Sequence, residues 1–172
     1  MPEKNTAKLM FRRSRKLAQL LVKAYPEKID AVFVVGSVAA NMPTNHSDID
    51  LVVVTKDETP DFWGEINLKA IEIARTKHPE TTAEVRIAPT AEVKSFILGE
   101  SGNLKAKYRL SRGAIPLFMH EREFPKSLFP KSLIAKALAP RKSLIKRKYA
   151  QYKAGIENRL KANKKRNAKR FR

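Results

Sequence analysis

Two acidic residues in the segment Asp48-Ile49-Asp50 carry the clearest chemical signal of this sequence. The segment opens a run of β-branched residues, and side chains along a β-strand alternate between its two faces. Asp48 and Asp50 would therefore share one face at a separation of about 7 Å, with Ile49 on the other face. Two carboxylates this close repel each other unless a cation lies between them. Mg²⁺ suits such a pair, because it binds carboxylates and keeps water and substrate phosphates as its other ligands.

A second group of residues, upstream of the two acids, fits a phosphate. Gly36-Ser37 follows a short apolar stretch, and ten residues separate it from Asp48. Glycine lets the backbone approach a ligand closely, and the Ser37 hydroxyl with the N–H groups of the next turn can surround a phosphate. Ser47 lies directly before the acids, where it can touch a nucleotide or hold the entrance to the acidic strand. Gly-Ser and Asp-x-Asp at this separation together predict a nucleotide site.

A third carboxylate is needed if two metal ions assist phosphoryl transfer, because the second ion and the attacking oxygen require an acid on an adjacent strand. Glu84 lies in the segment 81–88, whose apolar and polar residues alternate with a period of two. This alternation places Glu84 and Arg86 on the same face of the predicted strand. Glu84 could serve as the third acid, or it could simply pair with Arg86 or face solvent, and both interpretations stay open here.

These residues need a sheet to bring them together, and the hydrophobic periodicity predicts one. Pro116 places the last strand at an edge of the sheet, because proline cannot donate a ladder hydrogen bond. In the helix expected over 59–77, Trp63 is assigned to the apolar stripe with Ile66 and Ala70. The fold class is α/β (α+β), a small mixed β-sheet flanked by helices. The expected strands are 31–35, 48–54, 81–88 and 114–120, and the expected helices are 6–24, 59–77, 90–98 and 103–111.

Positive charge is concentrated at the C-terminus. The chain has 36 Lys and Arg against 17 Asp and Glu, and residues 131–172 hold 16 of the basic residues with a single acid. Such a tail predicts contact with a polyanion, most often nucleic acid. We expect a domain over 1–123, a Pro/Lys/Ser-rich linker over 124–141 and a basic helical tail over 142–172. The residues expected to contact nucleic acid are Arg141, Lys142, Lys146, Arg147, Lys148, Lys153, Lys164, Lys165 and Arg166.

Composition excludes several classes of protein. Cysteine is absent, which excludes disulfides and thiolate metal sites. No apolar run approaches the roughly 20 residues of a membrane-spanning helix, so no membrane partner is expected. The N-terminal segment is basic but lacks the apolar core of a secretory signal, and a cytoplasmic location is expected. The oligomeric state stays open.

The motif residues together resemble a known family. Gly36-Ser37, Asp48-Ile49-Asp50 and Glu84 on a later strand resemble the nucleotidyltransferases of the DNA polymerase beta type, especially the minimal nucleotidyltransferases. The resemblance covers about residues 8–120. It implies that Asp48, Asp50 and Glu84 are catalytic and bind two Mg²⁺ ions, or Mn²⁺ in their place. It also implies that Gly36 and Ser37, with Ser47 beside the acids, hold a nucleoside triphosphate such as ATP.

Two functions follow from these patterns. The first is an enzyme that transfers a nucleoside monophosphate from a nucleoside triphosphate to a hydroxyl and releases pyrophosphate. The basic tail would then hold an RNA acceptor, with tRNA as one candidate. The alternative is a catalytically silent nucleotidyltransferase fold that binds RNA as a structural component of a ribonucleoprotein or viral particle. The absence of an arginine shortly after Gly36-Ser37 favours the alternative, whereas the three acids favour the enzyme.

Overall fold

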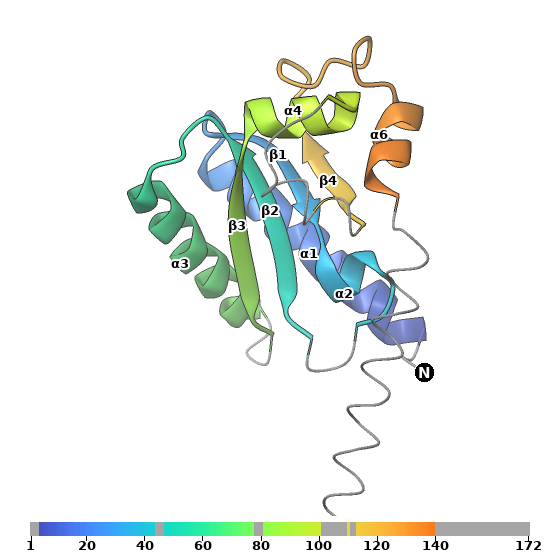
Figure 1. Cartoon of the computed structure of the whole chain (residues 1–172). Coiled ribbons are helices and arrows are strands. Elements are labelled where there is room, and N and C mark those ends of the chain that lie inside the picture. The colour runs from blue at the N-terminus through green and yellow to red at the C-terminus, as the bar shows by residue number, and fades with distance from the viewer. Residues whose placement is uncertain (1–3, 44–46, 78–80, 101–109, 111–112, 140–172) are drawn as a thin grey trace, which may run out of the picture. The chain divides into compact units, whose positions relative to one another are not determined.

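A computed structural model describes residues 4–43, 47–77, 81–100, 110 and 113–139 of the chain (Figure 1). Contacts between residues divide the chain into two compact units, Met1–Pro140 and Arg141–Arg172, and the described residues all belong to the first. The helices and strands along the chain are α1 (Lys4–Ala24), β1 (Ile29–Val34), α2 (Gly36–Ala39), β2 (Ile49–Thr55), α3 (Pro60–Lys77), β3 (Ala83–Pro89), α4 (Thr90–Leu98), β4 (Ile115–Met119) and α6 (Lys131–Leu138).

The four strands form one mixed sheet in the order β3-β2-β1-β4. β1 pairs with both β2 and β4 in antiparallel fashion, and β2 pairs with β3 in parallel. The fold class expected from the sequence is thereby confirmed. β4 lies at an edge of the sheet, as expected from Pro116, which cannot donate a ladder hydrogen bond.

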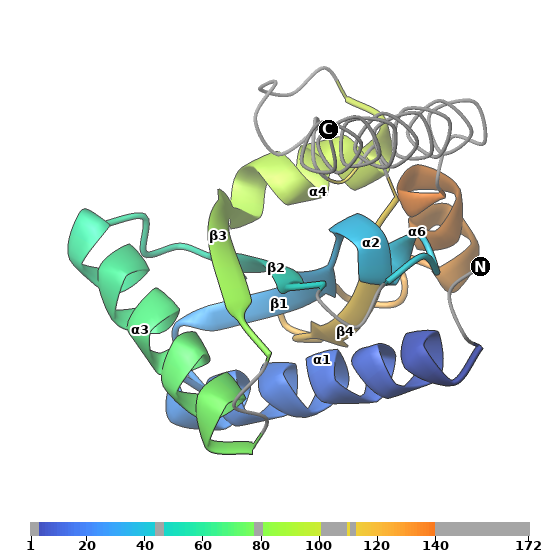
Figure 2. The same ribbon diagram turned by 90° about the horizontal axis from the view of Figure 1, so that it is seen from below.

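Helices cover both faces of the sheet (Figure 2). Alternate residues of each strand belong to two separate hydrophobic clusters, as the period-two pattern requires. α1 and α3 pack on one face, for example through Leu21 and Ile66, and α4 and α6 contribute Val93 and Leu138 to the cluster on the other face. None of the helices in the described part of the chain is long and apolar enough to cross a bilayer.

The apolar stripe of α3 differs by one residue from the predicted stripe. Phe62, Ile66 and Ala70 follow each other at intervals of four and are fully or almost fully buried. The Phe62 ring also meets Tyr25 edge-on, with 5.6 Å between the ring centroids. Trp63 lies one position further around the helix and is 45% exposed, so its assignment to the core was wrong. The predicted positions of Ile66 and Ala70 are confirmed.

The segment that follows β4 packs closely against the domain. Phe124, Phe129 and Leu138 are each at most 4% exposed and belong to the cluster beneath α4. The two phenylalanine rings lie 5.3 Å apart in an edge-to-face arrangement. The described residues of 124–141 therefore differ from the linker that the prolines indicated, because apolar residues between the prolines are buried. The helix expected over 103–111 lies outside the described residues except for Leu110, which is buried.

Candidate active site

Strands β2 and β3 bring two of the predicted acids side by side. They pair in parallel, and Asp50 is the direct partner of Glu84 in the register. Their strand neighbours Leu51 and Val85 point into the core beneath α1 and α3. Asp50 and Glu84 therefore share the opposite face of the sheet, where both are half-buried. The predicted alternation of Asp50 and Leu51 is confirmed by this arrangement.

Gly36 lies directly against Asp50. The backbone N–H of Val35 donates to the carbonyl of Asp50 at 3.0 Å, which joins the end of β1 to the start of β2. Gly36 follows with a φ of +69°, a conformation that residues with a side chain rarely adopt. A Cβ atom added to Gly36 would come within 2.2 Å of the Asp50 Oδ2 atom. The position therefore requires glycine for both reasons, and the glycine leaves room for the carboxylate.

The other two predicted acids have polar partners. Asp48 immediately precedes β2, is exposed, and accepts a hydrogen bond from the Thr82 hydroxyl. Glu84 forms an ion pair with Arg86, two residues along the same strand face. Within the residues that the structure describes, no three His, Cys, Asp or Glu side chains are grouped closely enough to hold a metal ion. The structure thus brings Asp50 and Glu84 together as strand neighbours, while Asp48 is turned to Thr82.

The donor set nevertheless fits a hard cation. Mg²⁺ is commonly held by one or two carboxylates together with water and substrate phosphates, so a cage of three protein ligands is not required. Asp50 and Glu84 supply two carboxylates on one face of the sheet. The space against Gly36 that a Cβ would fill is taken by the Asp50 carboxylate. These residues are therefore compatible with Mg²⁺ or Mn²⁺.

Ser37 belongs to the short helix that begins at Gly36. The carbonyl of Ser37 accepts the N–H of Met42 at 2.8 Å, and the carbonyl of Gly36 accepts the N–H of Ala40 at 3.1 Å, so the turn closes directly after the strand. Ser47 is half-buried, next to Asp48.

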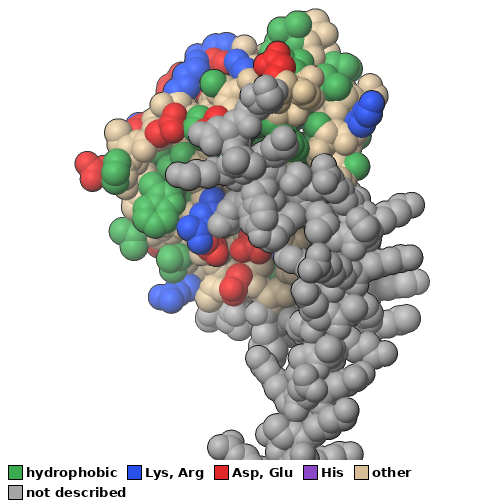
Figure 3. Space-filling model, viewed as in Figure 1, with side chains coloured by type: hydrophobic (Ala, Val, Ile, Leu, Met, Phe, Trp, Pro, Cys, Tyr) green, Lys and Arg blue, Asp and Glu red, His purple; other side chains and the backbone are tan. Residues whose placement is uncertain are grey.

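Several acidic side chains lie close to a basic one on the side of the domain seen in Figure 3. Several expected residues lie outside the described part of the chain. The predicted nucleic-acid contacts of the tail all belong to this group, namely Arg141, Lys142, Lys146, Arg147, Lys148, Lys153, Lys164, Lys165 and Arg166.

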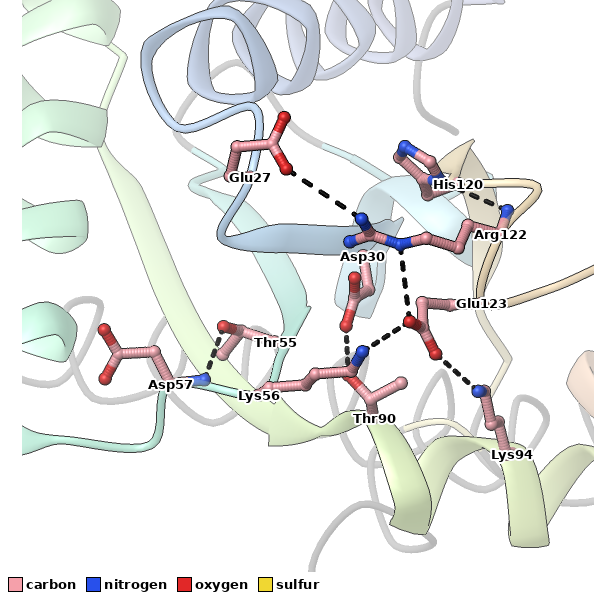
Figure 4. Close-up of polar contacts among 10 residues, drawn as sticks. All are labelled: Glu27, Asp30, Thr55, Lys56, Asp57, Thr90, Lys94, His120, Arg122 and Glu123. Carbon is pink, nitrogen blue, oxygen red and sulfur yellow. Dashed lines mark hydrogen bonds and ion pairs between the residues drawn. The ribbon is translucent and has the colours of Figure 1, made fainter.

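The sequence prediction missed a second polar cluster, at the opposite end of the sheet (Figure 4). Its centre is Glu123, whose side chain is only 10% exposed. Glu123 forms ion pairs with Lys56 at the end of β2, with Lys94 in α4 at 2.6 Å, and with Arg122 at 3.6 Å. Each cation comes from a different part of the chain, which is why no local spacing pointed to the cluster.

The same end of the sheet holds a buried carboxylate. Asp30 in β1 is 2% exposed and accepts a hydrogen bond from the Thr90 hydroxyl at 2.6 Å.

The lysines around Glu123 change its acidity. Hydrogen bonds from Lys56 and then Lys94 lower the pKa of Glu123 to about 2. Charge compensation of this kind stabilises a folded domain.

Comparison with protein families gives one match. The family model described as "Polymerase beta, Nucleotidyltransferase" matches residues 15–104, which is slightly more than half of the chain. This range includes Gly36, Asp48, Asp50 and Glu84. A comparison with curated protein sequences finds no match.

Solved structures with a similar fold include toxin–antitoxin proteins and an adenyltransferase. A toxin–antitoxin structure with AMP-PNP is 12% identical, with a TM-score of 0.43, and the match covers 85% of this chain and 98% of that chain. The toxin–antitoxin MntA-HepT is 13% identical with a TM-score of 0.39, over 86% and 97% of the two chains. Spectinomycin adenyltransferase AAD(9) from Enterococcus faecialis, with ATP and spectinomycin, is 14% identical with a TM-score of 0.41, over 76% and 63%.

Proposed function

Because this chain belongs to the polymerase beta nucleotidyltransferase family and is therefore a nucleotidyltransferase, we propose that it transfers a nucleoside monophosphate from a nucleoside triphosphate to a hydroxyl group on RNA. The hydroxyl oxygen loses its proton to water as it attacks the α-phosphorus, the bond from that phosphorus to the bridging oxygen breaks, and pyrophosphate leaves. The observation that carries the proposal is the register of β2 and β3, which puts Asp50 and Glu84 side by side, with Gly36 against Asp50.

Each residue of the site has a separate task. Asp50 and Glu84 hold negative charge at the point where the triphosphate and the attacking hydroxyl must meet. Asp48 completes the acidic group after a rotation that releases the Thr82 hydroxyl. Gly36 and Ser37 lie where the triphosphate would bind, with Ser47 next to the acids. Such a site works mainly by positioning its reactants and by stabilising charge, since phosphoryl transfer needs little covalent help from the protein.

Divalent metal ions would be held by Asp48, Asp50 and Glu84. When bound, Mg²⁺ or Mn²⁺ neutralises charge on the phosphates and increases the acidity of the acceptor hydroxyl. These three carboxylates alone would repel a triphosphate, so we expect activity to depend on the metal.

RNA as the acceptor is supported by charge. The net charge of +19 is concentrated in the last quarter of the chain, and a small-molecule acceptor would not need it. We propose that the basic residues of 141–166 bind the phosphate backbone of the acceptor. tRNA is one candidate, and ATP is one candidate donor.

The test is incubation of the full chain with each labelled nucleoside triphosphate, Mg²⁺ and total RNA. We expect label in RNA from at least one nucleotide, and loss of labelling when the metal is chelated. Label on protein instead of RNA would overturn the choice of acceptor. No labelling with any nucleotide in Mg²⁺ or Mn²⁺ would favour the catalytically silent alternative.

One observation favours that alternative. Glu84 is ion-paired with Arg86, so its charge could be purely structural. Glu84→Gln separates the two functions, with Glu72→Gln as a matched control, because Glu72 forms a comparable exposed ion pair with Lys69. Exposed pairs of this type contribute about 0–1 kcal/mol to stability, so both variants should fold. Loss of transfer in Glu84→Gln alone would support catalysis, and equal activity of both variants would remove Glu84 from the site.

A further inference from the structure

The exposed face of α1 carries an unusual charge pattern. The helix has 21 residues, of which seven are Lys or Arg and none is Asp or Glu. Helix α3 packs on the same face of the sheet, and it carries three basic and three acidic residues in 18. The two helices have the same structural task, so covering the sheet does not explain the charge of α1.

The cations of α1 lie in rows along one face. Lys8, Arg12 and Lys16 follow each other at intervals of four residues, and so do Arg15, Gln19 and Lys23. At 100° per residue, these positions fall within an arc of roughly 100°, and they extend about 22 Å along the helix. We call these six residues the basic face of α1. All six are exposed.

The opposite, apolar face of α1 packs in the domain core. Met10, Leu17 and Leu21 are at most 3% exposed, and they pack with residues of the sheet and of α3. Arg13, which follows Arg12 in the sequence, donates to the Thr81 hydroxyl at 2.8 Å and is not part of the basic face. Among the described residues, no ion pair involves Lys8, Arg12 or Lys16.

This arrangement is unfavourable for the helix by itself. Cations at intervals of four repel each other, and no acid of α1 offsets that repulsion. A bound polyanion would replace this repulsion by a net attraction, because each phosphate that contacts a lysine or arginine releases counterions.

From these observations we infer that the basic face of α1 binds the phosphate backbone of the RNA acceptor. The inference rests on the proposed function for the identity of the polyanion. α1 covers the face of the sheet opposite Asp50 and Glu84, but it contacts α2, the helix that begins at Gly36. RNA on the basic face would therefore reach the acids by passing the end of the sheet where α2 lies. The surface would hold the body of the RNA while its reacting hydroxyl reaches the acids.

A lipid surface fits the same face less well. Helices that bind at a membrane interface insert an apolar face between the lipids, and they carry their basic residues on the other side. The apolar face of α1 is buried in the core and is not available for insertion. The exposed side of α1 therefore offers charge that attracts phosphates, but no apolar surface that would insert among the acyl chains of a bilayer.

The test compares two full-length variants that each lose four positive charges. The first replaces Lys8, Arg12, Arg15 and Lys16 by Gln, which keeps helix propensity high. The matched control replaces four exposed cations outside both α1 and the basic tail by Gln, namely Lys28, Arg75, Arg122 and Lys126. Binding of a labelled single-stranded RNA is measured against salt concentration, without nucleotide or Mg²⁺.

We expect the slope of log affinity against log salt to fall by about 2 to 3 in the α1 variant, since each phosphate contact on a single strand contributes about 0.7. The control should change by less than half as much. An unchanged slope in the α1 variant, or an equal change in both variants, would overturn the inference. So would loss of binding to phosphatidylserine vesicles with unchanged binding to RNA.

A cross-linking experiment keeps the inference testable if the fourfold variant does not fold. A photoreactive p-benzoylphenylalanine replaces Gln19, in the middle of the basic face, or Thr76, an exposed residue of α3. RNA should cross-link at position 19 and much less at position 76, and equal yields would contradict the inference. Neither experiment depends on catalysis, so a protein that binds RNA through α1 but transfers no nucleotide would refute only the proposed function.

Discussion

Both ends of the sheet hold carboxylates, but the partners of these carboxylates differ between the two ends. At one end, Glu123 receives three cations, and its pKa falls to about 2. At the other end, Asp50 and Glu84 lie side by side on neighbouring strands, Glu84 pairs with Arg86, and Asp48 accepts a hydrogen bond from Thr82. At the first end, which we call the compensated end, cations of the domain itself balance the charge of Glu123. The second end places carboxylates of two strands next to each other, where a metal ion would be held.

This difference separates a structural cluster from a candidate active site. A carboxylate surrounded by lysines contributes to stability, because removing it leaves several cations close together. Carboxylates grouped with few cations reduce stability, and their natural partner is a metal ion that arrives with the substrate. Substitutions at the two ends should therefore affect different properties of the protein.

The largest effect is expected at Asp50. Asp50→Asn should lower nucleotidyl transfer by at least about a hundredfold, since metal-assisted charge stabilisation contributes several kcal/mol to the transition state. The melting temperature should fall little or should rise, because one of the repelling charges is removed. Transfer of label from nucleoside triphosphate to RNA measures the first effect, and thermal unfolding measures the second.

Asp57→Asn is the control for this substitution. Asp57 is a carboxylate near the compensated end, where it pairs with Lys28 at 3.0 Å. A hydrogen bond from the Thr59 hydroxyl is the main cause of its lowered pKa, and the bond to Lys28 adds to it. The control should keep its activity. Full activity in Asp50→Asn would refute the assignment of the active site to this end of the sheet.

The second effect concerns stability at the compensated end. Glu123→Gln removes the charge that Lys56 and Lys94 share, and we expect a loss of about 1.5–3 kcal/mol, as for hydrogen bonds to a charged group. Unfolding in urea should show a lower midpoint, while transfer activity of the folded fraction stays unchanged. A variant that is as stable as the original protein, or one that folds but is inactive, would contradict the division of roles between the two ends.

A smaller effect is expected at two glycines, Gly36 and Gly99, whose comparison separates the contact with Asp50 from backbone strain. Gly36→Ala and Gly99→Ala both place a side chain at positive φ, and each should cost about 1 kcal/mol. Only at Gly36 does the new Cβ meet Asp50, whereas nothing lies within 4 Å of a Cβ at Gly99. Transfer activity should therefore fall in Gly36→Ala alone. Equal activity of the two variants would show that the contact with Asp50 is not needed.

Much of the fold follows from local patterns. The strand over 49–55 and the helix over 90–98 lie within one residue of their predicted limits, since alternation and periodicity determine them. Trp63 was misplaced because two adjacent aromatic residues, Phe62 and Trp63, compete for one stripe, and only tertiary packing decides between them. The burial of Phe124 could not be predicted either, since the prolines around it are equally typical of a linker.

The candidate site was predictable to a different extent. Asp50 and Gly36 stand out because a dense local motif contains them, and the register of β3 then confirms that Glu84 is the neighbour of Asp50. The bond from Thr82 to Asp48 depends on how the start of β3 meets the start of β2, which no spacing reveals. Glu123 was missed for the same reason, because its partners are 29 and 67 residues away.

The last prediction concerns the pH dependence of the compensated end. The pKa of Glu123 is about 2 in the folded protein and about 4.5 when the chain is unfolded. The folded carboxylate thus stays ionised where the unfolded one already binds a proton. Its contribution to stability is complete above about pH 4.5 and is lost as the pH falls towards 2. Urea unfolding of the original protein and of Glu123→Gln at constant ionic strength should show midpoints that converge between about pH 5 and pH 2.5. If the two midpoints stayed equally far apart over this range, Glu123 would be contributing through packing and not through its charge.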